Sequence, residues 1–319
     1  MRVLITGANG FVGQALSQRL FGQREAGAAS PHIQSATLLD VRFDHTSPQE
    51  NVRQLVGSIG DRDFLDDILK DPYDLVFHLA SIPGGLTERD YDLGRAINVT
   101  ATLELLERLR RQAAPPVVVF ASTIGVYGAP LPDFVTDDTP ARPNNMSYSA
   151  QKMIGEILID DFSRRGWIDG RSIRLPGIVA RPPEPNGAIS IFMSDLIREL
   201  AAGRSYTCPI SARSTVWLMS ARCVADNLLH AALLPPHTAA QRRTWLLPVI
   251  RTSIGELVQG IAQMFGSEVL ERIRYEPVDT VESIFGRQPP IDVPASRAAG
   301  FVDDGSIEML IRNALQGAG

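Results

Sequence analysis

The sequence has few cysteines and histidines, two and five among 319 residues. Cys208 and Cys223 are too few for a disulfide framework, and neither lies at the spacing of metal ligands. The histidines are scattered along the chain. We therefore expect neither a fold held by disulfides nor a metal site.

Long apolar runs and an excess of one charge are also missing. No apolar run approaches the roughly 20 residues that a membrane helix needs, and the chain enters a strand-like segment at Arg2–Thr6 without a charged and then apolar leader. The 31 basic and 36 acidic residues are spread along the chain and give a net charge of −5. This balance argues against nucleic acid or an anionic membrane as a partner. We expect a cytoplasmic protein.

The first half of the chain alternates short apolar runs with helical patterns, in a sequence that is 44% hydrophobic. Uninterrupted runs of this length are typical of strands buried on both faces of a parallel sheet. We predict strands at 3–6, 37–40, 52–57, 74–80, 117–122 and 172–175. We predict helices between them at 12–21, 61–69, 89–111 and 145–165. The alternation predicts an α/β fold with a doubly wound parallel sheet, the Rossmann architecture.

After Leu175 the pattern changes. Residues 176–188 are rich in proline and glycine, too rigid and too broken for a helix or a central strand. Helical patterns follow at 189–202, 221–234, 253–265 and 306–315, mixed with short strands. We predict a doubly wound domain over residues 1–175 and a smaller C-terminal α/β part over 176–319, with segments that return to the first domain.

A glycine-rich turn, GANGFVG, follows the first predicted strand. Gly7 permits the tight turn, Gly10 lets the backbone approach a pyrophosphate, and Gly13 lets the helix pack on the strand. The N-terminus of that helix offers N–H groups to the phosphates. Asp40 ends the second strand, where a carboxylate accepts hydrogen bonds from the adenosine ribose hydroxyls. The sequence therefore predicts a bound dinucleotide.

Asp40 also favours NAD over NADP. At about 4 Å from a 2′-phosphate, a carboxylate would cost roughly 4 kcal/mol per charge at an effective dielectric constant near 20. Arg42 lies close enough in the sequence to pair with that phosphate, which leaves NADP as the alternative.

Tyr148 and Lys152 lie four residues apart in SYSAQK, at the start of a predicted helix, so both side chains lie on one face. Ser122 and Thr123 end the fifth strand, and HLAS at 78–81 ends the fourth. The carboxyl ends of parallel strands form the edge where open α/β sheets bind ligands. We expect these side chains to meet there.

This set of residues suits the oxidation of an alcohol. A base must take the hydroxyl proton while hydride leaves for the nicotinamide. A tyrosine phenol titrates near 10, so acting as that base at neutral pH requires lowering its pKa by about two to three units, about 3–4 kcal/mol. A lysine four residues away and the positive nicotinamide both lower it. We predict Tyr148 as the base, Lys152 as its supporting cation, and Thr123 as the hydroxyl that holds the substrate oxygen.

The motifs GANGFVG, HLAS, STIGVYG and YSAQK occur together with a strand that ends at Leu175-Pro176. In this combination the chain resembles the extended short-chain dehydrogenase/reductase superfamily, the group of nucleotide-sugar epimerases and dehydratases, over essentially its whole length. The resemblance implies that Thr123, Tyr148 and Lys152 are catalytic and that NAD is the cofactor. It also implies a homodimer formed through the helices near 89–111 and 145–165.

The same resemblance places NAD in residues 1–175 and the substrate mainly in 176–319. In this family an acidic residue usually follows the glycine of the third strand, and Ser58 stands there, so we expect a weaker adenine contact or one from the backbone. The cofactor-binding residues that we predict are Gly7, Asn9, Gly10, Phe11, Val12, Gly13, Asp40, Val41, Ser58, Ile59, Leu79, Ala80, Ser81, Asn98, Ala121, Tyr148, Lys152, Leu175, Pro176 and Ile178.

A narrower resemblance concerns the substrate. The segments ERDYDLG, LPDFVTDD, DFSRRGWIDGRSIRLP, ARPPEPNGAIS, CPIS and AAGF resemble those members of the superfamily that oxidise the C2 hydroxyl of D-erythronate, a four-carbon sugar acid, with NAD. The implied function is oxidation of such an acid to the 2-oxo acid. Two loops depart from the pattern: SIPGG follows His78, and Gly177 stands in place of a threonine. Both would face the substrate, which leaves the identity of the acid open.

A small sugar acid needs a cation or a cluster of donors for its carboxylate and partners for its hydroxyls. Arg181 and Asn186 are candidates, as is Arg213, which lies where nucleotide-sugar enzymes place a phosphate-binding arginine. Glu88 is a weaker candidate, and Trp217, in an apolar run, is expected in the core. The substrate-binding residues that we predict are Ser81, Ser122, Thr123, Tyr148, Arg181, Asn186, Ser190 and Arg213.

A UDP-sugar epimerase with tightly bound NAD is the main alternative function. A dehydratase is disfavoured because Ile124 and Gly125 follow Thr123, where dehydratases usually carry acidic residues. A silent NAD-binding regulator is disfavoured because Tyr148 and Lys152 are both present.

Overall fold

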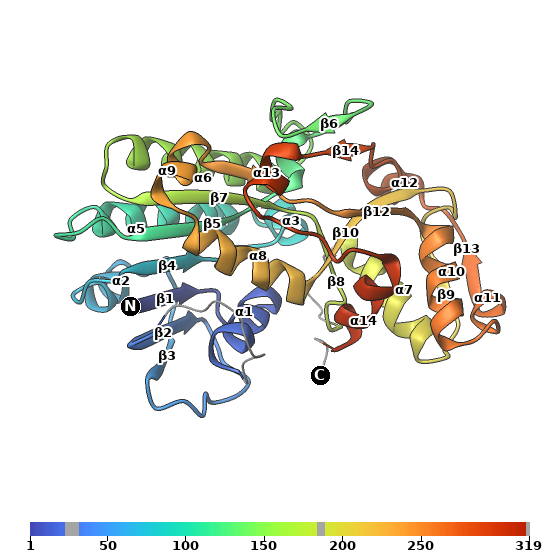
Figure 1. Cartoon of the computed structure of the whole chain (residues 1–319), viewed down its shortest axis with the longest axis horizontal. Coiled ribbons are helices and arrows are strands. Elements are labelled where there is room, and N and C mark those ends of the chain that lie inside the picture. The colour runs from blue at the N-terminus through green and yellow to red at the C-terminus, as the bar shows by residue number, and fades with distance from the viewer. Residues whose placement is uncertain (23–31, 184–188, 317–319) are drawn as a thin grey trace. The chain divides into compact units, whose positions relative to one another are not determined.

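The computed structural model describes residues 1–22, 32–183 and 189–316. The chain forms two compact units, whose elements are labelled in Figure 1. The first unit consists of Met1–Gly128, Ala141–Arg174 and Ala225–Leu246. The second consists of Ala129–Pro140, Leu175–Val224 and Leu247–Gly319.

A seven-stranded sheet with the order β11-β7-β5-β4-β1-β2-β3 forms the centre of the first unit. The ladders from β3 through β2, β1 and β4 to β5, and from β7 to β11, are parallel. The strands are β1 (Arg2–Thr6), β2 (Ser35–Asp40), β3 (Val52–Val56), β4 (Leu75–His78), β5 (Val117–Thr123), β7 (Asp169–Leu175) and β11 (Thr244–Leu246). The chain proceeds from β1 to β3 on one side and resumes at β4 on the other, which is the switch point of a doubly wound sheet. The predicted α/β Rossmann architecture is confirmed.

Helices connect these strands. They are α1 (Phe11–Phe21), α2 (Arg62–Ile68), α3 (Gly84–Arg89), α4 (Tyr91–Arg95), α5 (Thr102–Leu109), α6 (Ser147–Arg164), α8 (Ala221–Leu233, in this unit from Ala225) and α9 (Pro236–Gln241). A core cluster lies between the sheet and α2, α5 and α6, and includes Val76, Phe120, Leu105 and Phe162. Because neighbouring strand residues such as Phe77 are fully buried as well, both faces of the sheet are covered.

The helix predicted over 89–111 is present from Tyr91 to Leu109, but it is not one regular α-helix. The structure has α4, then a π-helical turn (Ala96–Ala101), then α5, with α3 preceding them. Asp90 separates α3 from α4: its backbone is not helical, with φ −135° and ψ 84°, and its side chain accepts a hydrogen bond from the N–H of Leu93. Asp90 thus ends one helix and caps the next.

The second unit contains smaller sheets. Its strands are β6 (Val135–Thr136), β8 (Gly177–Val179), β9 (Tyr206–Cys208), β10 (Thr215–Ser220), β12 (Ile250–Ser253), β13 (Ile273–Tyr275) and β14 (Ile291–Asp292). They form a three-stranded sheet, β12-β10-β8, and the pairs β13-β9 and β14-β6. Within residues 176–183, the described part of the proline-rich segment, the structure has one strand, β8, which contains no proline and lies at the end of its sheet.

Helices cover these sheets and complete a second core. They are the short turn at Ile189–Ile191, α7 (Phe192–Ala201), α10 (Ile254–Phe265), α11 (Val269–Arg272), α12 (Asp279–Phe285), α13 (Pro294–Ala298) and α14 (Ile307–Gln316). Leu196, Val216 and Leu310 are fully buried in this core. Trp217 is 2% exposed and its indole N–H donates to the carbonyl of Pro289, so its predicted core position is confirmed.

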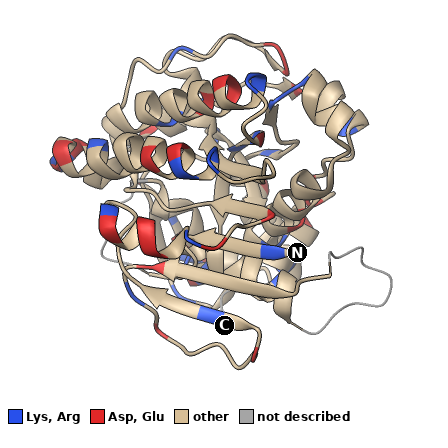
Figure 2. Ribbon diagram, turned by 90° about the vertical axis from the view of Figure 1, so that its left-hand side faces the viewer, with Lys and Arg blue, Asp and Glu red and all other residues tan. Residues whose placement is uncertain are grey.

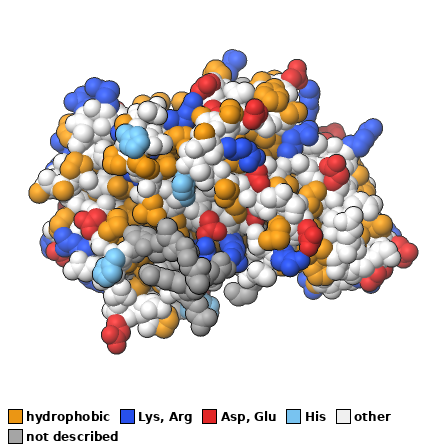
Figure 3. All heavy atoms as spheres, viewed as in Figure 1, with side chains coloured by type: hydrophobic (Ala, Val, Ile, Leu, Met, Phe, Trp, Pro, Cys, Tyr) orange, Lys and Arg blue, Asp and Glu red, His pale blue; other side chains and the backbone are white. Residues whose placement is uncertain are grey.

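Charged side chains lie mainly on helices and loops, while the strands are largely uncharged (Figure 2). On the face shown in Figure 3, basic and acidic side chains are interspersed. Within the described ranges, no helix is both long enough and apolar enough to cross a membrane.

Candidate active site

The glycine-rich turn lies against the residues that follow β4. Gly7 has φ +73°, and a Cβ atom on it would lie 2.6 Å from the backbone nitrogen of Ala80, so only glycine fits there. A Cβ on Gly10 would meet a single atom within 4 Å, the Gly7 oxygen at 3.3 Å. Gly10 also precedes α1 without any side-chain cap. The turn is therefore an open cradle at a helix N-terminus, which suits a pyrophosphate.

The Asp40 carboxylate is held by two backbone N–H groups. Asn9 donates to one oxygen at 2.9 Å and Val41 to the other at 2.7 Å. Each oxygen keeps a further lone pair, which suits the two hydroxyls of an adenosine ribose. The Asn9 amide also donates to Asp44 at 3.0 Å, and Arg42 lies 4.0 Å from that same carboxylate. Arg42 is thus placed beside an acidic partner.

Five further predicted cofactor residues follow the ends of β3 and β4: Ser58, Ile59, Leu79, Ala80 and Ser81. Ser58 accepts a hydrogen bond from the N–H of Gly60 at 3.1 Å, and Ile59 is buried. Leu79 donates its N–H to the carbonyl of Thr6 at 3.1 Å. The glycine cradle, the Asp40 carboxylate and these backbone segments fit a dinucleotide along the carboxyl edge of the sheet.

Asn98 holds the turn after β4. Its amide oxygen accepts from the N–H of Ile82 at 2.8 Å and from the Ser81 hydroxyl at 3.1 Å, and its NH₂ group donates to the Ile82 carbonyl and to Gln151. Asn98 is 2% exposed. The π-helical turn that carries Asn98 thereby connects the Ser81–Ile82 turn to α6 through Gln151.

Tyr148 and Lys152 lie on α6, as predicted. The Lys152 ammonium is buried and donates to the carbonyl of Ala121 at 2.8 Å. It lies 4.8 Å from the centre of the Phe120 ring and 5.8 Å from that of Tyr148. Burial lowers the pKa of Lys152 to about 7, and the charge of Glu156 acts in the opposite direction. Lysine and tyrosine are therefore close enough for the charge of one to affect the other.

Thr123 ends β5 with its hydroxyl oxygen accepting the N–H of Gly125 at 3.1 Å. Because that oxygen is the acceptor, the hydroxyl hydrogen remains able to donate to another group. Gly84, in the SIPGG segment, lies close to α6: a Cβ on Gly84 would lie 3.7 Å from the Cβ of Tyr148.

A buried ion pair, which the sequence did not predict, lies one turn beyond Lys152. Glu156 accepts from the Ser122 hydroxyl at 2.5 Å and from the guanidinium of Arg174 at 2.9 and 2.7 Å. Its position four residues after Lys152 was the available signal, because residues four apart share a helix face. Ser122, predicted to bind substrate, is 2% exposed and directs its hydroxyl to this carboxylate.

Glu88, a weaker substrate candidate, binds the start of α6. Its carboxylate accepts the backbone N–H of Ser147 at 2.6 Å, a favourable place for an anion because helix N-termini carry partial positive charge.

The remaining substrate candidates belong to the second unit. Arg181 donates its backbone N–H to Ser194 at 2.9 Å, and Ser190 lies in the turn Ile189–Ile191. Arg213 is exposed. Burial acts to raise the pKa of Glu282, but hydrogen bonds from Ser214 and Ser211, and last the charge of Arg213, lower it. Asn186 lies outside the described residues. Three predicted cofactor residues also belong to this unit. Leu175 and Pro176 are buried, and Ile178 pairs with Met219 in the sheet.

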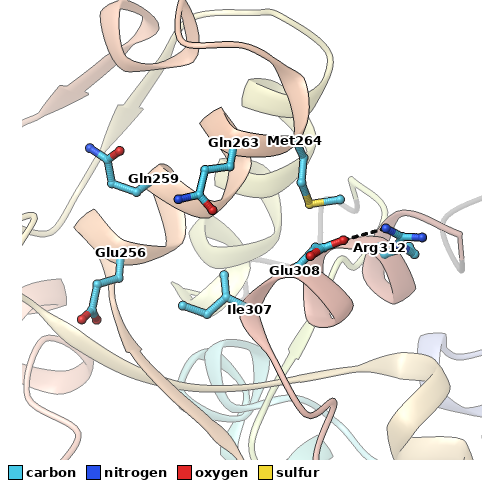
Figure 4. Close-up of a pocket in the computed structure, with 8 residues that line it drawn as sticks. Glu256, Gln259, Gln263, Met264, Ile307, Glu308 and Arg312 are labelled. Carbon is cyan, nitrogen blue, oxygen red and sulfur yellow. Dashed lines mark hydrogen bonds and ion pairs between the residues drawn. The ribbon is translucent and has the colours of Figure 1, made fainter.

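A cavity of about 570 Å³ opens between α10 and α14 in the second unit (Figure 4). Glu308 and Arg312 on its wall pair with each other at 2.7 Å, and Glu256 caps α10 through Ser253. None of the predicted site residues lines it. Because its arginine is paired and its other charges are acidic, it is a poor receptor for a sugar acid. Among the described residues, no three His, Cys, Asp or Glu side chains gather as a metal site requires.

Residues 3–230 match the NAD-dependent epimerase/dehydratase family. The chain belongs to this family. Within it, the chain is 36% identical to D-erythronate dehydrogenase of Cupriavidus necator, over 100% of this chain and 99% of that protein. It is 33% identical to D-erythronate dehydrogenase of Haemophilus influenzae, over 99% of both.

Solved structures of epimerase/dehydratase type agree with the fold. The nucleoside-diphosphate-sugar epimerase from Agrobacterium tumefaciens is 31% identical, with a TM-score of 0.89 over 99% of this chain and 95% of that one. The L-threonine dehydrogenase from Cupriavidus necator is 20% identical, with a TM-score of 0.84 over the full length of both chains, and shares the fold. The predicted superfamily is thus confirmed, and NAD(H) is the cofactor of the family to which the chain belongs.

Proposed function

We propose that this chain catalyses the NAD-dependent oxidation of the C2 hydroxyl of a small sugar acid to the 2-oxo acid, with D-erythronate as the first candidate. The observation that carries the proposal is the identity of 36% and 33% to two D-erythronate dehydrogenases over essentially the full length of the chain. When bound, NAD accepts the hydride from C2 of the substrate.

In this proposal, Tyr148, Thr123 and Lys152 carry out the proton chemistry. The Tyr148 phenolate takes the proton of the C2 hydroxyl. Thr123 holds the same oxygen by donating its hydroxyl hydrogen, since its own oxygen already accepts the N–H of Gly125. The Lys152 ammonium, near the Tyr148 ring and fixed on the Ala121 carbonyl, favours the phenolate form by its charge.

In the proposal, the cofactor and the substrate bind mainly to different parts of the sequence. Residues 1–175 bind NAD, with the phosphates at the glycine turn and the ribose at Asp40, which selects NAD over NADP. Residues 176–319 supply most of the substrate site. There Arg181 and Arg213 bind the carboxylate, and Ser190 a hydroxyl. Ser81 is a further candidate for a hydroxyl partner.

The test is NADH formation at 340 nm by the purified protein, measured with D-erythronate and its stereoisomers, five-carbon aldonic acids, and UDP-sugars. One NADH per molecule of acid consumed is expected. The Tyr148→Phe protein serves as the control, because it keeps the cofactor site and lacks the base. Absence of NADH with every acid would refute the proposal.

An epimerase acting on nucleotide sugars is the second candidate, favoured by the 31% identity and TM-score of 0.89 to the protein described as a nucleoside-diphosphate-sugar epimerase. Such an enzyme recycles its NAD, so conversion of a UDP-sugar to its epimer without net NADH would select it. We rank it second because a diphosphate and a uracil need more basic and aromatic groups than Arg181 and Arg213 provide.

We further propose a cytoplasmic homodimer formed through α5 and α6. Leu103, Ile154 and Ile157 are large hydrophobic residues on these helices with exposed fractions of 38%, 41% and 56%, and an interface would cover them. Ile157→Arg should yield a monomer in light scattering, whereas Leu233→Arg, at another exposed position, on α8, should not. A monomeric wild-type protein would refute the dimer, and cell fractionation tests the location.

A further inference from the structure

The first unit contains a buried ion pair between Glu156 and Arg174, and Glu156 lies one helical turn after the proposed catalytic Lys152 on α6. The side chain of Glu156 is 4% exposed and that of Arg174 is 10% exposed, and two hydrogen bonds join them. Arg174 also donates to the Tyr127 hydroxyl at 3.0 Å and lies 5.0 Å from the centre of that ring. Burial opposes the charge of Arg174, but its bonds to Glu156 raise its pKa above the usual value. Arg174 is therefore charged.

Such a pair needs a reason beyond stability. Removing two ions from water costs several kcal/mol each, and well-packed apolar residues of similar size often stabilise a fold as well or better. β7 and α6 are already joined to the core by residues such as Ile173 and Ile159, both fully buried. A carboxylate at this place thus points to a role in the neighbouring site.

Two side chains of α6 form hydrogen bonds with consecutive residues near the end of β5. Lys152 binds the carbonyl of Ala121, and Glu156 accepts the hydroxyl of Ser122. Gly155 makes this possible, because a Cβ on it would lie 2.4 Å from the ring of Phe120. The helix therefore approaches the strand closely enough for side chains on either side of Gly155 to reach it. The next residue of β5 is Thr123.

Glu156 is also the one anion near Lys152 among the described groups that affect its charge. Tyr148 and Glu156 face Lys152 from α6, and Phe120 and Ala121 face it from β5. From β4 comes His78, which is neutral because burial, and then the charge of Lys152, lowers its pKa to about 3. Glu156 itself binds Arg174, which in turn donates to Tyr127, and the charge of Glu156 acts on Asp160.

We propose that Glu156 is a positioning residue for the proton-transfer pair: its carboxylate, oriented by Arg174, keeps Lys152 in its ammonium form and fixes β5 through Ser122. This deepens the proposed function, since it concerns the same Tyr148 and Lys152. Without the carboxylate, the buried ammonium is less favoured, so Lys152 loses its proton at lower pH. The Tyr148 phenolate then lacks its cation and forms only at higher pH.

The experiment replaces the ion pair with neutral pairs that can still pack. Two double variants, Glu156→Gln/Arg174→Gln and Glu156→Gln/Arg174→Met, avoid an unpaired buried arginine, and circular dichroism verifies their folding. Glu156→Asp keeps the charge and is the conservative variant. Asp160→Asn removes a carboxylate from the same helix one turn farther from Lys152, and is the matched control.

Two readouts decide the outcome. The first is the acid limb of the pH profile of kcat/KM. The second is the tyrosinate absorbance at 295 nm of the protein without cofactor, with Tyr148 isolated by subtracting the Tyr148→Phe titration. In the double variants we expect both to move to higher pH by up to about one unit, because of the two charges removed only that of Glu156, about one helical turn away, acts on Lys152. Glu156→Asp and Asp160→Asn should leave both within a few tenths of a unit.

A folded double variant that titrates like the wild type, or an equal shift with Asp160→Asn, would overturn the inference. The absorbance titration needs neither substrate nor turnover, so it tests Glu156 even if no sugar acid is oxidised. Failure of the proposed substrate and failure of this inference are therefore distinguishable.

Discussion

Replacing Asp40 with alanine should allow the protein to bind NADP. The carboxylate is held between the N–H groups of Asn9 and Val41 at 2.9 and 2.7 Å, so it cannot turn away from a phosphate at the ribose 2′ position. Two charges about 4 Å apart repel by roughly 4 kcal/mol at an effective dielectric constant of 20 and by about 1 kcal/mol in water. Asp40 is half-buried, so the repulsion lies between these limits.

This repulsion corresponds to a weakening of NADP binding by about 5- to 1000-fold. Removing the Asp40 carboxylate also frees the N–H groups of Asn9 and Val41, which can then donate to the phosphate. NAD should bind less tightly, because each lost charged hydrogen bond to the ribose costs about 1.5–3 kcal/mol. The ratio of the two affinities should therefore change by more than either affinity alone.

The assay is titration calorimetry of the cofactor-free protein with NAD and with NADP, followed by kcat/KM with each cofactor. The control is Arg42→Gln, alone and combined with Asp40→Ala, because Arg42 is the cation that could attract the phosphate. Equal binding of both cofactors by the wild type, or an Asp40→Ala protein that still rejects NADP, would refute the electrostatic reasoning.

Three further outcomes are expected. Tyr148→Phe should lower kcat by at least about 10³-fold with an unchanged NAD dissociation constant, since general-base catalysis contributes about 10²–10⁴; retention of a tenth of the rate would rule out this base. Arg181→Ala and Arg213→Ala should each raise the KM for the sugar acid by tens-fold, from the loss of about 1.5–3 kcal/mol, whereas the surface variant Arg204→Ala should not. The buried Lys152 has its pKa lowered from 10.5 to about 7, so the unfolded chain binds more protons between these values and the free energy of unfolding rises with pH there. Lys152→Met should therefore raise the melting temperature of the cofactor-free protein more at pH 6 than at pH 9, and the opposite order would contradict the assigned shift.

Parts of the fold that depend on local spacing could be predicted from the sequence. The apolar runs marked the strands of the parallel sheet, because strands buried on both faces need no polar alternation. The glycine turn could be assigned because Gly7 requires a backbone conformation that other residues rarely adopt. Tyr148 and Lys152 could be paired because a helix places residues four apart on one face.

The helix predicted over 89–111 forms from Tyr91 to Leu109, but its start and its irregular middle could not be predicted from the local sequence. Its residues have good helix propensity, but Asp90 caps a new helix and Asn98 is drawn into a π-helical turn by its bonds to Ile82 and Gln151. Those partners lie 16 and 53 residues away in the sequence. Propensity describes only the local chain, so tertiary contacts can override it.

The sequence by itself determined the class of the fold, the glycine turn, the carboxylate of Asp40 at the end of β2 and the tyrosine-lysine pair on α6, because each depends on neighbouring residues. Only the tertiary structure decided what surrounds them. It joined Glu156 to Ser122 and Arg174, separated by 34 and 18 residues, and enclosed Lys152 so that burial lowers its pKa. Desolvation and ion pairing depend on which distant segments exclude water from a group, and spacing along the chain does not contain that information.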